Sequence, residues 1–305
     1  MDKGAKMKFG VNSDSIKKTM QRFFGDKENR EIKHEEAFDF IKQAGYDCLD
    51  FSFGGFDNDM PDDEFYARIT ELKAYLDEIG LEVSQTHGRC GYPKLTTDQI
   101  FERAVKEIKA TAILGAKYIV IHPLRTPNSN YEGDKELRKA ENKAFFKRLQ
   151  PYLEQYGVVE CIENLFGEDK VRGICAPNTC SRPEEILEYL EYLNSDSFAV
   201  CFDVGHMLLT GDITGDTVYG AMRKLGKHIK VLHVHDNKKV KDDHVPPFMG
   251  VLDWKEFVLT LKEIDYQGVF SMELVPYRAL PNPSKHALLE FYKFARAVAD
   301  PEKML

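Results

Sequence analysis

Runs of apolar and β-branched residues alternate along this chain with segments in which apolar residues recur every three or four positions. The runs predict β-strands, and the segments between them predict amphipathic helices. Ile69, Leu72 and Leu76 show the helical spacing clearly. Thr96 and Ser181, each followed three residues later by Gln or Glu, predict helix starts with a capping box. The predicted strands are residues 7–12, 45–53, 81–87, 117–122, 158–164, 198–204, 229–236 and 268–274.

Eight strands that alternate with helices predict parallel pairing and an α/β class of fold. Eight such units in 305 residues favour closure into a (β/α)8 TIM barrel, with a single domain over residues 1–305. The alternative is an open doubly wound sheet, which usually carries a Gly-rich phosphate loop after an early strand. Neither G-x-G-x-x-G nor G-x-x-x-x-G-K-S/T occurs, so the barrel is favoured.

The longest irregular stretches are expected to follow the carboxyl ends of strands, where the active sites of barrel enzymes are built. Residues 13–33, after the first strand, are also expected to form a loop. The other stretches are 52–62, 123–134, 165–181, 236–252 and 275–284.

The composition narrows the class of protein. The chain carries 42 Lys and Arg against 50 Asp and Glu, and this net charge of −8 disfavours a nucleic-acid partner. The chain lacks the run of about 18 apolar residues that a membrane span requires. The first residues lack the apolar core of a signal peptide, and six scattered cysteines are typical of reduced thiols. We therefore expect a cytoplasmic protein with neither a membrane nor a nucleic acid as partner.

Acidic and histidine residues gather at the predicted ends of the later strands. The residues that end the fifth to eighth strands are Glu163, Asp203, His235 and Glu273. Since side chains alternate along a strand, all four are predicted to face the inside of the barrel at its mouth. Three carboxylates there would repel one another, and a divalent cation removes that conflict. This oxygen-rich set with one imidazole suits one ion of Mn²⁺, Mg²⁺, Co²⁺ or Zn²⁺.

Further candidates lie at other strand ends or in the loops that follow them. Arginines there are able to hold a phosphate or a carboxylate through two parallel hydrogen bonds. His233, which shares a strand face with His235, is interpreted as a core histidine. The candidates for contact with a substrate are His87, His122, His206, His244, Asp242 and Arg125, with Arg89 and Arg278 as further arginines.

Six short motifs follow one another in a recognisable order. They are VIHP at 120–123, IEN at 162–164, FDVGH at 202–206, HVHD at 233–236, DDH at 242–244 and ME at 272–273. In this order they resemble the xylose isomerase-like TIM-barrel superfamily, which holds sugar isomerases and epimerases together with endonuclease IV. The resemblance covers nearly the whole chain. It implies a metal-dependent TIM barrel that acts on a small carbohydrate.

The resemblance to the ketose 3-epimerase and isomerase branch also implies roles for residues. One divalent metal would be held by Glu163, Asp203, His235 and Glu273. The implied catalytic pair is Glu163 and Glu273, which would transfer a proton through an enediolate that the metal stabilises. His206 matches a substrate-contacting histidine, whereas Lys241 stands where the epimerases keep an arginine. We therefore expect an isomerase or epimerase of a sugar or sugar phosphate, in a family whose barrels are often homo-oligomers.

Three alternatives stay open. An inosose dehydratase-type lyase begins with the same proton abstraction, and a barrel that only binds a carbohydrate would carry the same pocket. The third alternative is a zinc phosphodiesterase like endonuclease IV, in which nine ligands hold three zinc ions. The net charge of −8 and the acidic segment 52–62 count against it. Its nine ligand candidates here are His87, His122, Glu163, Asp203, His206, His235, Asp242, His244 and Glu273.

Overall fold

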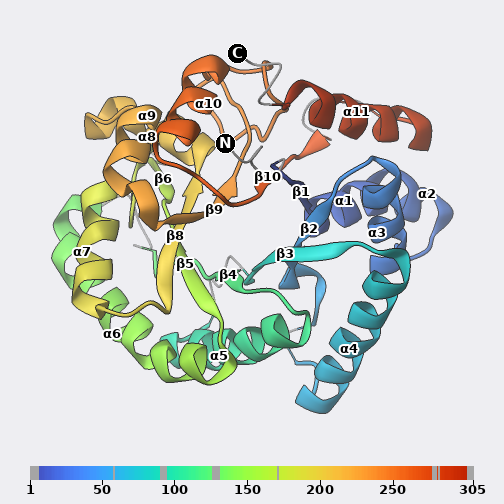
Figure 1. Cartoon of the computed structure of the whole chain (residues 1–305), viewed down its shortest axis with the longest axis horizontal. Helices are drawn as coiled ribbons and strands as arrows, with labels where there is room; N and C mark the ends of the chain where they lie inside the picture. The colour runs from blue at the N-terminus through green and yellow to red at the C-terminus, as the bar shows by residue number, and fades with distance from the viewer. Residues whose placement is uncertain are drawn as a thin grey trace, which may run out of the picture.

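The computed structural model describes residues 7–57, 59–89, 95–125, 131–169, 172–276, 280 and 282–300. Eight parallel strands form one sheet that curves into a nearly closed ring, and helices surround it (Figure 1). The order around the sheet is β10-β1-β2-β3-β4-β5-β8-β9. Val234 pairs in parallel with Met272 and so joins the two ends of the sheet. The predicted (β/α)8 barrel is confirmed.

The strands of the barrel lie within the eight predicted runs. They are β1 (Phe9–Asn12), β2 (Cys48–Ser52), β3 (Glu82–His87), β4 (Tyr118–Val120), β5 (Val159–Glu163), β8 (Phe198–Asp203), β9 (Ile229–His233) and β10 (Phe270–Met272). The α-helices are α1 (Ser13–Met20), α2 (Asp26–Glu28), α3 (His34–Gln43), α4 (Asp62–Ile79), α5 (Thr97–Ile113), α6 (Tyr131–Tyr156), α7 (Pro183–Leu193), α8 (Val204–Thr214), α9 (Val218–Leu225), α10 (Trp254–Glu263) and α11 (Lys285–Val298). In the segments described, no helix is both long and apolar enough to cross a membrane.

The helical spacing in the sequence predicts which faces are buried. Ile69, Leu72 and Leu76 are fully buried on α4, as expected. The capping box at the start of α5 is also confirmed, because the Thr96 hydroxyl accepts a hydrogen bond from the backbone N–H of Gln99. The Gln99 side chain in turn accepts one from the backbone N–H of Thr96.

The capping box predicted at Ser181 is wrong. Helix α7 begins at Pro183, and Arg182 is its N-cap residue with extended backbone dihedrals of −111° and 131°. A proline disfavours helical dihedrals in the residue before it, so the helix cannot begin earlier. Ser181 precedes the N-cap instead, and its buried hydroxyl has no hydrogen-bond partner among the described residues.

Several segments expected to be irregular contain regular structure. A 3-10 helix (Phe53–Gly55) lies within residues 52–62, and α6 begins at Tyr131, within residues 123–134. Residues 165–181 contain a hairpin of two antiparallel strands, β6 (Phe166–Asp169) and β7 (Ile174–Pro177). Residues 13–33 contain α1, a π-helical segment (Gln21–Gly25) and α2. Asn12 caps α1, because its side-chain oxygen accepts a hydrogen bond from the backbone N–H of Ser15. That cap is a signal which the sequence carries and which the loop prediction missed.

Small apolar side chains fill the inside of the barrel. This interior layer consists of Val120, Cys161, Ala199, Cys201 and Val231, with Tyr118 and Val159 packed against it. The strand alternation predicted for β5, β8 and β9 is therefore confirmed. The next inward positions along these strands lie two residues further on and belong to polar side chains. They are Glu163, Asp203 and His233.

The ring of His34, the first residue of α3, packs inside an aromatic cluster on Phe56 with a centroid distance of 4.9 Å. Burial, together with the charges of Lys17 and Arg68, lowers the pKa of His34 to about 3. His34 is therefore neutral in the folded chain over the whole physiological pH range.

We predict that this histidine makes the fold less stable in acid. An unfolded chain protonates His34 near pH 6.5, whereas the folded chain does not. The free energy of unfolding should therefore fall below pH 6.5, by up to about 1.4 kcal/mol per pH unit from this group. His34→Phe keeps a ring but cannot titrate, so its stability relative to the natural chain should rise between pH 6.5 and 4.5. Urea unfolding at several pH values measures this, and a constant difference would contradict the prediction.

Candidate metal centre

The carboxyl ends of the barrel strands bring together six histidines and four carboxylates. His87 ends β3, Glu163 ends β5, Asp203 ends β8 and His233 ends β9. The others lie just beyond strand ends or in the loop that follows β9. The full set, which we call the metal-ligand cluster, is His87, His122, Glu163, Asp203, His206, His233, His235, Asp242, His244 and Glu273.

Three carboxylates of the cluster converge on one nitrogen atom. The Nδ1 atom of His233 lies 3.3 Å from Glu163 Oε1, 3.7 Å from Glu273 Oε2 and 4.0 Å from Asp203 Oδ2. The pairing of β8 with β9 explains this, because Asp203 and His233 are direct partners in the parallel ladder. The side chains of Glu163, Asp203 and His233 are all at least 99% buried, while that of Glu273 is 20% exposed.

A second group forms on the other oxygen of Glu163. His122 Nε2 lies 2.8 Å from Glu163 Oε2, and His87 Nε2 lies 3.7 Å from the same atom. The ring of His87 also stacks on that of His233, with centroids 5.1 Å apart. Glu163 therefore lies between two sets of imidazoles.

A third group lies on the side of the loop after β9. His235 Nε2 is 3.2 Å from Asp203 Oδ1, and its ring stacks on that of His244 at 3.9 Å between centroids. His244 Nε2 is 2.7 Å from Asp242 Oδ2. Burial lowers the pKa of His244, but Asp242 outweighs that effect and raises it to about 9. His206, which follows Asp203 by one turn of α8, has its Nδ1 3.7 Å from Asp203 Oδ2.

Opposite charges hold one another in their ionised forms across the cluster. Burial opposes the ionisation of Glu163, but His122 and His233 lower its pKa well below its usual value. Burial also opposes the charge on His206, yet Asp203 raises the pKa of that imidazole to about 10. Without another cation, protonated histidines therefore balance the buried carboxylates. Metal binding at these groups would release protons, since an imidazole ligand must be neutral.

The chemistry of the cluster fits a divalent cation. Asp203 Oδ2, Asp242 Oδ1 and Nδ1 of His235 are buried and have no hydrogen-bond partner among the described residues. Buried polar atoms are usually paired, so these atoms point to a missing partner. Four groups of three residues have potential ligand atoms within 4.8 Å of one another: His87, Glu163 and His233; Asp203, His233 and Glu273; Asp203, His206 and His235; and His235, Asp242 and His244. Mixed carboxylate and imidazole donors suit Mn²⁺, Co²⁺ and Zn²⁺.

The structure distributes the four predicted metal ligands over two groups. Glu163, Asp203 and Glu273 surround His233, whereas His235 lies on the other side of Asp203. His233 is fully buried, as a core histidine is, but its neighbours are carboxylates. Because β9 ends at His233, this residue occupies the inward position beside Asp203. The pairing of β9 with β8 distinguishes His233 from His235, because it sets His233 beside Asp203. The sequence pattern alone does not reveal this pairing.

The arginine and lysine candidates lie outside the cluster. Arg125 is exposed, with its guanidinium 6.0 Å from the ring centroid of Phe166. Arg89 supports the fold instead, because its guanidinium donates a hydrogen bond to the backbone carbonyl of Phe56. Lys241 is exposed on the loop after β9. Arg278 lies outside the described residues.

Asp236 fixes the loop that carries Asp242 and His244. One oxygen of its buried carboxylate accepts hydrogen bonds from the backbone N–H groups of Asn237, Val251 and Leu252, at 2.9, 2.9 and 3.2 Å. The other accepts one from the indole of Trp254 at 3.0 Å. The two ends of the loop are thereby tied together. Trp254 is buried at the start of α10 in this structural role.

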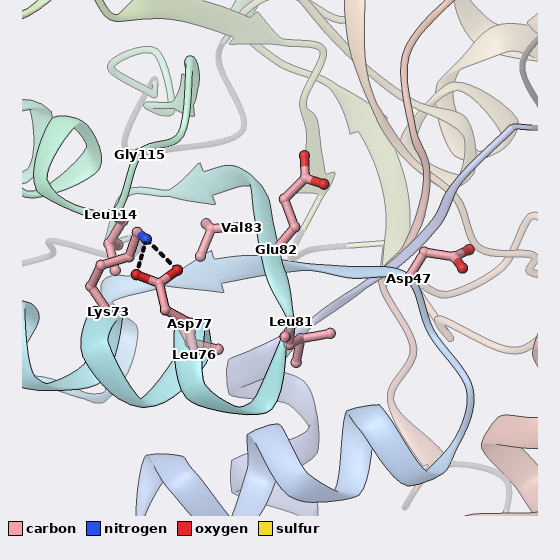
Figure 2. Close-up of a pocket in the computed structure, with 10 residues that line it drawn as sticks. Asp47, Lys73, Leu76, Asp77, Leu81, Glu82, Val83, Leu114 and Gly115 are labelled. Carbon is pink, nitrogen blue, oxygen red and sulfur yellow. Dashed lines mark hydrogen bonds and ion pairs between the residues drawn. The ribbon is translucent and has the colours of Figure 1, made fainter.

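A pocket of about 360 Å³ lies where β3 begins, at the other end of that strand from His87 (Figure 2). It is lined by residues that begin β3, such as Glu82, and by the end of α4. Lys73 and Asp77 form an ion pair in the wall of this pocket (Figure 2), and the Asp77 side chain is 65% exposed. Barrel enzymes place their chemistry at the carboxyl ends of strands, so we assign no activity to this pocket.

Comparison with known proteins identifies the family. The model of the xylose isomerase-like TIM barrel family matches residues 38–294. The chain belongs to this family. Two curated relatives from Methanocaldococcus jannaschii and Sinorhizobium fredii are matched by this chain over 62% and 56% of their lengths.

Xylose isomerase-like barrels with different activities are similar to this chain. A D-psicose 3-epimerase from Enterocloster bolteae is 25% identical over 252 residues, which cover 79% of this chain and 76% of that protein. A probable endonuclease 4 from Mycoplasmopsis synoviae is 30% identical over 182 residues, which cover 57% and 61%. The crystal structure of an IOLI protein with a bound zinc atom shares the fold, with a TM-score of 0.71 at 19% identity over 97% of this chain and 99% of that one.

We predict that Gly205 is required because it makes room for His235. A Cβ atom at Gly205 would lie 1.8 Å from Cε1 of the His235 ring. Gly205→Ala should therefore lower the free energy of unfolding by about 1–3 kcal/mol, as overpacking does. In a His235→Ala background the space is free, so the penalty should shrink by about 1 kcal/mol or more. Urea unfolding of the four proteins measures this coupling, and equal penalties in both backgrounds would contradict the placement of the ring.

Proposed function

We propose that this chain is a sugar or sugar-phosphate isomerase or epimerase that transfers a proton between Glu163, Glu273 and the substrate. The observation that carries the proposal is the meeting of these two glutamates around His233, at 3.3 and 3.7 Å from Nδ1. They come from β5 and from the segment after β10, and so approach one point from different sides of the mouth. Asp203 and His233 would complete a set of four ligands for one Mn²⁺, Mg²⁺, Co²⁺ or Zn²⁺.

The two glutamates differ in a way that suits different roles. The Glu273 side chain is 20% exposed and that of Glu163 is 1% exposed, so a substrate that enters from solvent meets Glu273 first. We therefore assign the removal of the proton next to the sugar carbonyl to Glu273. His122, 2.8 Å from Glu163, is placed to hold a proton that Glu163 gives or receives. A divalent cation in this centre would supply Lewis-acid stabilisation of the negative charge that develops on the sugar oxygens.

The polar side chains around the metal-ligand cluster suit a polar substrate. His87, His206 and His244 line the mouth as largely buried imidazoles, and Asp242 Oδ1 is an acceptor with no hydrogen-bond partner among the described residues. Hydroxyl groups of a sugar are both donors and acceptors, so they match this set. Arg125, whose exposed guanidinium lies 6.0 Å from the Phe166 ring centroid, would hold a phosphate or carboxylate at the far end of the substrate. The similarity to a D-psicose 3-epimerase supports a ketose as the substrate class.

A zinc phosphodiesterase is the second candidate function. The observation that favours it is that all nine ligand candidates lie in the one cluster, in groups that could hold more than one ion. The similarity to a probable endonuclease 4 supports it as well. Cleavage of duplex DNA at an abasic site by the zinc-loaded protein would favour this function. A lyase of the inosose dehydratase type is distinguished by a product that has lost water.

We predict exchange with solvent during turnover. A panel of ketoses and their phosphates, incubated with the metal-loaded protein in deuterium oxide, should yield product with deuterium on the carbon next to the carbonyl. Glu273→Gln should lower kcat by a factor of about 10² to 10⁴, because the base is lost. Glu263→Gln, a change on the exposed face of α10, is the control and should leave kcat unchanged. Product without deuterium, formed at the normal rate, would contradict proton transfer and indicate a hydride shift.

A further inference from the structure

Asn164, the residue after Glu163, uses its side chain to hold the backbone of Asp203. The Nδ2 atom of its amide donates a hydrogen bond to the backbone carbonyl of Asp203 at 2.8 Å. The Oδ1 atom accepts one from the backbone N–H of the same residue, also at 2.8 Å. Asn164 is buried, with 3% of its surface exposed. Because both bonds go to one residue, they fix the distance and the orientation of the Asp203 backbone relative to Asn164.

These two bonds continue the pairing of β5 with β8 beyond the end of β5. The last backbone pair in the ladder is Glu163 beside Cys201. Strand β5 ends at Glu163, whereas β8 runs two residues further, to Asp203. The amide of Asn164 therefore takes the place of backbone groups that β5 no longer provides. Its removal would leave the buried backbone N–H of Asp203 without this partner, which is costly in a protein interior.

The carboxylate of Asp203 is held from a second side. Asp203 is the N-cap residue of α8, and its Oδ1 accepts a hydrogen bond from the backbone N–H of His206 at 2.7 Å. Its Oδ2 has no hydrogen-bond partner among the described residues and lies 4.0 Å from Nδ1 of His233. The amide of Asn164 and the first turn of α8 thus hold Asp203 so that Oδ2 is left for the centre.

We propose that Asn164 is a positioning residue for the metal centre, because it sets where Asp203 stands relative to Glu163. The inference rests on the proposed function, since it assumes that these two carboxylates hold the same ion. Residues that orient ligands contribute to metal affinity without contacting the metal. Asn164 itself is not a ligand in this arrangement, because both polar atoms of its amide bond to the Asp203 backbone.

The affinity for Co²⁺ and the spectrum of the bound ion test this role separately from activity. In a titration with a competing chelator, Asn164→Ala should weaken Co²⁺ binding about 10- to 100-fold. The visible absorption bands of bound Co²⁺ should also shift, because the geometry of the ligands changes.

Asn142→Ala is the matched control. Asn142 is also a buried amide with two bonds to the backbone of one residue: it accepts from the N–H of Leu124 at 2.7 Å and donates to its carbonyl at 3.1 Å. Neither residue belongs to the four potential ligand groups. This variant loses the same pair of bonds, yet it should bind Co²⁺ with the affinity and the spectrum of the natural chain.

The outcomes separate the inference from the proposed function. An Asn164→Ala protein with the natural affinity and spectrum would overturn the inference alone. Equal losses of affinity in the two variants would also overturn it, because they would reflect a general loss of stability. A natural chain that binds no Co²⁺ would overturn both the inference and the proposed metal centre.

A measurement on the natural chain covers the case in which Asn164→Ala does not fold. Residue-resolved hydrogen exchange of the metal-free protein reports on the backbone N–H of Asp203, which donates to Asn164. If Asn164 holds Asp203 before any metal binds, this N–H should exchange about 10³-fold or more slowly than in an unfolded chain. Exchange close to the rate of an unfolded chain would overturn the inference.

Discussion

Three carboxylates converge on the Nδ1 atom of His233 in the mouth of the barrel, and this convergence constrains the rest of the structure. Taking an unpaired carboxylate out of water costs several kcal/mol, so Glu163 and Asp203 require positive charge close by. The surrounding histidines supply it when they are protonated, which is why the pKa of His206 is raised to about 10. A divalent cation would supply the same charge at the point where the three carboxylates meet. The same side chains form an ion-pair network without a metal and would form a ligand shell around one.

The fold positions the side chains of the cluster through the register of the strands and through buried residues packed against them. The small side chains of Cys161 and Cys201 fill the barrel directly below Glu163 and Asp203. The parallel ladder sets His233 beside Asp203, and the absence of a side chain at Gly205 lets the His235 ring lie against α8. Two buried carboxylates outside the cluster contact its surroundings. Asp236 holds the loop after β9, and Asp50 faces His233. Buried acids outside the cluster therefore contribute to its geometry.

Much of this arrangement could be predicted from the sequence, and what the sequence pattern leaves open has physical causes. Alternation with a period of two predicted the inward face of β9, but it does not say where the strand ends. His233 and His235 share that face, and only the pairing with β8 selects His233 as the partner of Asp203. Asp50 lies within a strand, and not at its end, so a search for polar residues at strand ends passes over it.

The same limit explains the errors in the loops. The hairpin of β6 and β7 consists of short strands with a mixture of polar and apolar residues, so it carries no periodic signal. The net charge of −8 was informative only as a sum, because it does not show which acids are buried. In the structure, Glu163, Asp203 and Asp50 belong to the barrel interior, and the surplus of acid is in part a property of the site.

A crystal structure of the protein loaded with Mn²⁺ or Co²⁺, with the ions located by their anomalous scattering, tests the central claim most directly. The account predicts one fully occupied ion, bound at about 2.0–2.3 Å by Glu163, Asp203, Glu273 and Nδ1 of His233. Ions held instead by His235, or a mouth in which protonated histidines exclude any ion, would contradict it.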